Sequence, residues 1–127
     1  YSDLERNPDN ETIPGVLIFR IEAALLYFNT QNIQKSIRER IATQITTLKL
    51  VVIDLSNAPQ VDVAGSQMLT ELQHELQVAG VQMRIAEARS SVRDLLHRAG
   101  LAAKVGDISH KLSLSDEIES FMNAQHK

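Results

Sequence analysis

The 127-residue sequence contains no cysteine. This absence excludes disulfide bonds, thiolate metal sites and cysteine nucleophiles together, and it suits a reducing cytosol. Long apolar segments are missing as well, because the longest uninterrupted run, residues 23–28, is far shorter than the roughly 20 residues of a membrane-spanning helix. No signal-peptide pattern occurs. If the chain works at a membrane, another part of a longer polypeptide must provide the spanning segments.

Neither sign of charge dominates, and the common catalytic motifs are absent. Thirteen Lys and Arg against 16 Asp and Glu give a net charge of -3, so no basic field attracts nucleic acid. Glycine-rich nucleotide-binding loops and the hydrolase pattern Gly-x-Ser-x-Gly do not occur. Glu71 and His74 lie three residues apart on a predicted helix, but no further metal ligand accompanies them. We therefore expect no catalytic residue, no metal, no cofactor and no nucleic-acid partner.

The composition is that of one globular domain. Hydrophobic residues make up 43% and charged residues 23%, and the length fits a single core. Residues 1–12 are mostly polar, contain Pro8 and show no apolar periodicity, so we expect a linker there. Pro14-Gly15 then marks the start of order, and we assign the domain to residues 13–127.

Strand and helix patterns alternate after Gly15. Short apolar or alternating runs predict strands at residues 16–21, 23–28, 48–55, 81–86 and 105–110. Amphipathic spacing predicts helices from residue 30, from about residue 64 to 79, from residue 91 to 99, and from residue 113 or 115. This order implies parallel strands joined by crossover helices. We predict an α/β fold with a mixed, mostly parallel sheet flanked by about four helices.

Individual residues support these elements. Isoleucine recurs at four-residue spacing over the first helix, at Ile33, Ile37, Ile41 and Ile45. The run 48–55 is apolar almost throughout, as expected of a strand buried on both faces. Gly80 and Gly100 are expected to end the second and third helices. Ser91 and Asp94 form a capping-box-like pattern that predicts the start of the third helix.

The loop at residues 54–66 is the most informative place for function, because ligands of open α/β sheets bind at the carboxyl ends of strands. Asp62 is placed to cap the second helix and to complement its positive end. Gly65, in the first turn, would let the backbone of a partner approach, and unpaired amides there would accept an anion. The alternative is that Asp62 is only a cap and Gly65 only a packing residue, and local chemistry favours this alternative.

The same loop carries a resemblance to a known family. This sequence contains, in order, a hydrophobic strand, Asp54-Leu55-Ser56, a proline, Asp62-x-x-Gly65 and an amphipathic helix. The series resembles the signature of STAS domains. Upstream, Ile13-Pro14-Gly15 leads into the first predicted strand, and Leu26-Tyr27-Phe28-Asn29 leads into the first predicted helix. Both segments resemble the opening of the STAS tail of SulP-type transporters. The resemblance spans roughly residues 13–125 and points to the C-terminal cytoplasmic domain of sulfate permease-like anion transporters.

One position separates the branches of this family. In stand-alone anti-sigma-factor antagonists, the residue before the loop glycine is typically a serine that a kinase phosphorylates, and phosphate there adds about two negative charges. Here Ala64 occupies that position and Val63 precedes it, and neither side chain accepts phosphate. Ser66 follows Gly65 on a different face of the helix start. We expect no phosphoacceptor and favour the transporter branch, with an antagonist-like signalling module as the alternative.

The resemblance implies a regulatory or interaction domain of a secondary transporter for sulfate, bicarbonate or a related anion. It places the chain at the cytoplasmic face of the cell membrane, as part of an integral membrane protein, with residues 1–12 as the linker from a preceding membrane domain. The implied partners are that membrane domain of the same polypeptide, a second copy of the chain, or a cytosolic regulatory protein. We assign the interaction or regulatory loop to seven residues: Asp54, Ser56, Asp62, Val63, Ala64, Gly65 and Ser66.

Overall fold

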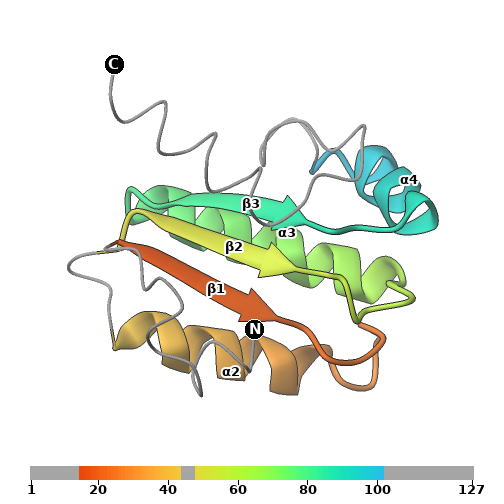
Figure 1. Cartoon of the computed structure of the whole chain (residues 1–127), viewed down its shortest axis with the longest axis horizontal. Coiled ribbons are helices and arrows are strands. Elements are labelled where there is room, and N and C mark those ends of the chain that lie inside the picture. The colour runs from red at the N-terminus through yellow and green to blue at the C-terminus, as the bar shows by residue number, and fades with distance from the viewer. Residues whose placement is uncertain (1–14, 44–47, 102–127) are drawn as a thin grey trace.

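Strands and helices alternate along the chain, as predicted. A computed structural model describes residues 15–43 and 48–101. In this part of the chain the strands are β1 (Val16–Arg20), β2 (Leu50–Asp54) and β3 (Gln82–Ala86). The helices are α2 (Thr30–Ala42), α3 (Val63–Val78) and α4 (Ser90–Arg98) (Figure 1). The α/β class is confirmed.

The sheet is parallel, in the order β1-β2-β3. Its register aligns Ile53 of β2 with Phe19 of β1 and with Ile85 of β3. Each strand reaches the next through a helix, first α2 and then α3, because parallel neighbours need a crossover connection. All three arrowheads therefore point to the same edge of the sheet in Figure 1, and the loops that follow β1, β2 and β3 leave from that edge.

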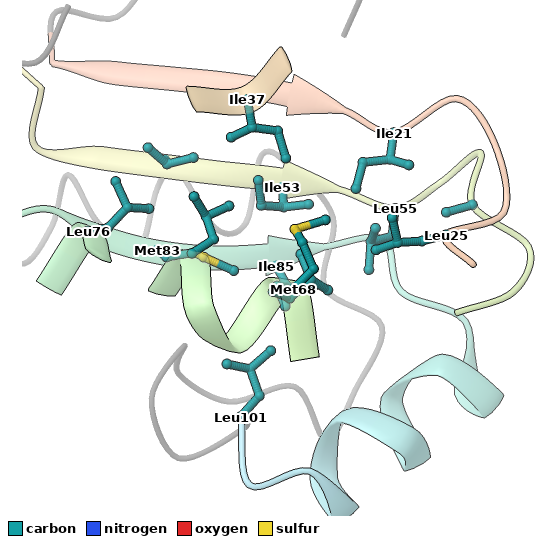
Figure 2. Packing of buried hydrophobic residues seen from close by; sticks show 14 of the residues in the cluster. Ile21, Leu25, Ile37, Ile53, Leu55, Met68, Leu76, Met83, Ile85 and Leu101 are labelled. Atoms are coloured by element: carbon teal, nitrogen blue, oxygen red, sulfur yellow. The ribbon is translucent and has the colours of Figure 1, made fainter. Parts of the chain in front are cut away.

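The main core lies between one face of the sheet and the helices α2 and α3. Alternate strand residues supply the sheet side of this core: Leu17, Val51, Ile53, Met83 and Ile85. Ile37 of α2 and Met68 of α3 lie among these side chains in Figure 2. Ile37 and Ile41 are buried, so the isoleucine stripe does face the core. The apolar residues that face this core therefore recur about every 3.6 residues along the helices and every second residue along the strands.

The opposite face of the sheet is buried too. Val16, Ile18, Leu50 and Val52 project from this face and are between 0% and 8% exposed. All five residues of β2 are buried, which confirms the prediction of a strand covered on both faces.

Glycine ends α3 and α4, as predicted. Gly80 and Gly100 both have φ of +79°, a region in which a Cβ atom is strained. After α3, the Gly80 amide donates to the Gln77 carbonyl (3.0 Å) and the Val81 amide donates to the Leu76 carbonyl (2.8 Å). This pair of bonds is a Schellman motif. Because Leu76 and Val81 are both buried, the motif also anchors the approach to β3 in the core.

The strand predicted at residues 23–28 is wrong. Leu25 makes only an isolated parallel bridge, to Val61. Tyr27 and Phe28 lie in a turn and are 75% and 66% exposed. The apolar run is therefore divided between a fully buried leucine and an exposed aromatic pair, which composition alone does not reveal.

Side chains, rather than a neighbouring strand, satisfy the backbone of this turn. Asn29 Oδ1 accepts the Leu26 amide (2.9 Å), and Asn29 Nδ2 donates to the Ala24 carbonyl (2.8 Å). The carboxylate of Asp62 accepts the amide of Tyr27 (2.9 Å). Because such local partners compete with a strand ladder, the chain turns into α2 instead of extending.

The predicted cap of α4 is also wrong. The helix begins at Ser90, with Arg89 at the N-cap position and no side chain bonded to the cap. Ser91 and Asp94 therefore lie inside the helix and do not form a capping box. The amide of Arg93 donates to the carbonyl of Arg89 (2.8 Å), which sets the helix start ahead of Ser91.

Some predicted features lie outside the described residues: the linker at residues 1–12, Ile45, the strand at 105–110 and the final helix. Every described strand is parallel, and three helices flank the described sheet. The mixed character of the sheet and the fourth helix thus stay predictions.

Candidate interaction site at the carboxyl edge of the sheet

Two segments distant in sequence meet at the carboxyl edge. One is the turn that follows β1, and the other is the loop from β2 to α3 (Figure 1). The amide of Leu25 donates to the carbonyl of Gln60 (2.8 Å), and the amide of Asp62 donates to the carbonyl of Leu25 (3.1 Å). The predicted loop is therefore only part of this edge, because the turn after β1 is bonded to it.

Asp62 joins these two segments. Its Oδ1 accepts the Gly65 amide (2.9 Å), so the predicted helix cap is confirmed. Its Oδ2 accepts the Tyr27 amide (2.9 Å) from the other segment. The Asp62 carbonyl also accepts the Ser66 amide (3.0 Å). The helix start thus already carries a carboxylate, which disfavours a second anion at the same place.

Gly65 is required by a close contact within the chain. A Cβ atom at this position would lie 2.6 Å from the carbonyl oxygen of Leu25 and 2.9 Å from Cγ1 of Val61. The backbone that approaches Gly65 is therefore that of Leu25, not that of a partner. The packing interpretation of this glycine holds.

The three residues around Gly65 differ sharply in accessibility. Val63 is 62% exposed, Ala64 is half-buried, and Ser66 is only 2% exposed. The hydroxyl of Ser66 donates to the carbonyl of Val63 (2.8 Å). This oxygen is therefore buried and engaged within the first turn of α3, and the expectation that Ser66 does not replace the missing phosphoacceptor stays a prediction.

Asp54 and Ser56 close the end of β2. Asp54 is 1% exposed; its Oδ2 accepts from Nε of Arg20 (3.3 Å) and its Oδ1 accepts the Ser56 amide (2.9 Å). The buried Ser56 hydroxyl has no hydrogen-bond partner among the described residues. The Arg20–Asp54 pair links β1 to β2, so this end of the predicted loop serves the sheet rather than an outer surface.

Three large apolar side chains are exposed at this edge, beside exposed polar residues such as Glu22, Asn57 and Gln60. Tyr27, Phe28 and Val63 are each more than 60% exposed. The two rings pack edge to face with centroids 5.6 Å apart. Asp62, the neighbour of Val63, accepts the amide of Tyr27, so the two backbone segments that carry these side chains meet at this edge. We call these three residues the aromatic patch. The sequence analysis overlooked it, although the polar Asn29-Thr30 that follows the rings is a signal of a turn at the surface.

Metal and membrane features are not found in residues 15–43 and 48–101. No three His, Asp or Glu side chains of this part come together as metal ligands. Glu71 accepts from the side chain of Gln34 (3.3 Å), on the neighbouring helix α2. No described helix has the length and hydropathy of a transmembrane segment.

Comparison with known proteins identifies the family. Residues 7–118 match the sequence profile of the STAS domain. The chain belongs to the STAS domain family. It is 25% identical over 129 residues to high affinity sulfate transporter 2 of Stylosanthes hamata, and 31% identical over 120 residues to sulfate transporter 2.1 of Arabidopsis thaliana. These alignments cover 95% and 84% of the chain but only 20% and 17% of the relatives, so the chain spans about a fifth of their length.

Solved structures show the same fold. The structure of the murine solute carrier 26 family member A9 anion transporter superposes with a TM-score of 0.80 at 18% identity, over 98% of this chain and 20% of that one. The STAS domain of a SulP transporter from Vibrio cholerae gives 0.69 at 16% identity, over 99% and 96%. The anti-sigma factor antagonist SpoIIAA, in its unphosphorylated form, gives 0.67 at 14% identity, over 93% and 95%. The STAS architecture predicted from the loop motif is confirmed.

Proposed function

We propose that this STAS domain is the cytoplasmic regulatory domain of a secondary anion transporter of the SulP type. The observation that carries the proposal is the alignment: 95% of the chain corresponds to a fifth of a protein named a sulfate transporter. The remaining four fifths of such a polypeptide would provide the membrane part. The domain would act through protein–protein or domain–domain contacts and not as an enzyme.

The carboxyl edge suits a contact role because hydrogen bonds and close packing hold its two segments together. Asp62 is bonded to both segments of the edge, and Gly65 packs directly on Leu25. A surface that is ordered before it binds loses little conformational entropy on docking. The polar atoms of Asp54, Asp62 and Ser66 are engaged in hydrogen bonds of the fold, which argues against a nucleophile or general base at this edge.

The alternative function is a stand-alone signalling module. The structural similarity to the anti-sigma factor antagonist SpoIIAA is the reason to test it. A phosphorylation switch needs an accessible hydroxyl. Val63 and Ala64 have none, and Ser66 is buried. Incubation with candidate kinases followed by mass spectrometry would decide the matter, because phosphate found on Ser66 would favour the signalling module over the transporter domain.

Truncation tests the transporter domain directly. We expect that removal of residues 13–127 from the polypeptide lowers uptake of sulfate, bicarbonate or a related anion, while the membrane part is still made and inserted. A matched variant carrying Val78→Gln, an exposed position far from the carboxyl edge, should transport like the unchanged polypeptide. Unchanged uptake, expression and assembly after truncation would contradict the proposal.

A further inference from the structure

We draw no further inference here: the strongest candidate, the aromatic patch of Tyr27, Phe28 and Val63 at the carboxyl edge of the sheet, carries nothing because nothing in the described part of the chain shows what covers it.

Discussion

Gly65→Ala should destabilise the domain, although the same change normally strengthens a helix. Alanine is favoured over glycine in a helix by about 1 kcal/mol. At this position, however, the new Cβ atom would lie 2.6 Å from the Leu25 carbonyl oxygen, where ordinary contacts begin at 3.4 Å. Two backbone segments would have to separate by about the difference, 3.4 minus 2.6, or 0.8 Å. Helix propensity therefore predicts that Gly65→Ala raises the free energy of unfolding, whereas packing predicts that it lowers it.

The magnitude follows from what must move. Overpacking against backbone costs about 1–3 kcal/mol. The shift also weakens the hydrogen bond from the Asp62 amide to the Leu25 carbonyl (3.1 Å), worth about 1 kcal/mol. After the gain of about 1 kcal/mol from helix propensity, we expect the free energy of unfolding to fall by about 2 kcal/mol.

Urea unfolding followed by circular dichroism measures this change. A loss of about 2 kcal/mol lowers the midpoint by roughly 1 M urea at the usual slope for small domains. Gln67→Ala is the control, because it places alanine at an exposed site in the same turn of α3 and should change the stability by less than about 0.5 kcal/mol. A Gly65→Ala variant as stable as the native domain, or more so, would refute the tight contact between α3 and Leu25.

Three further changes test other parts of the account. Asp62→Ala removes the cap and the bond to the Tyr27 amide and should cost about 1–2 kcal/mol in urea unfolding; no loss would show that the cap is dispensable. Leu69→Ala opens a cavity at a fully buried position and should cost about 2–5 kcal/mol, so a loss below about 1 kcal/mol would place Leu69 outside the core. Arg38→Ala breaks an exposed ion pair with Glu75 and should cost under about 1 kcal/mol, an effect that shrinks in high salt; a large, salt-independent loss would contradict this.

The fold was predictable where periodicity and burial agree. The isoleucine spacing at Ile37 and Ile41 matched a real core face, and the continuous apolar run matched the central strand β2. Gly80 ended α3 because only a residue without Cβ accepts φ of +79° without strain. In each of these cases one local preference coincided with the tertiary environment.

The wrong strand at residues 23–28 arose where side chains bond to the backbone. The aromatic run before Asn29 had a strand composition, but Asn29 and Asp62 provide hydrogen bonds that the pattern of apolar residues does not encode. The wrong cap of α4 has a different cause: Ser91 and Asp94 have the spacing of a capping box, but the helix begins one residue before Ser91 and no side chain caps it.

The candidate site was only partly predictable. Asp62 was correctly predicted as a cap because its position relative to the helix is local in sequence. The role of Gly65 depends on Leu25, forty residues earlier in the chain, and local chemistry could not identify that neighbour. The aromatic patch likewise depends on a contact between two distant segments. Sequence therefore located the loop but not the surface that the loop helps to form.

The most direct test of the account is the size and membrane association of the native polypeptide that carries this domain. An antibody raised against residues 15–101 detects it in carbonate-washed membranes and in the soluble fraction. The account predicts a polypeptide about five times longer than this chain, since the chain spans 20% of a sulfate transporter relative, and one that is released from membranes only by detergent. A carbonate-soluble polypeptide of the size of the 127-residue chain would contradict the transporter assignment.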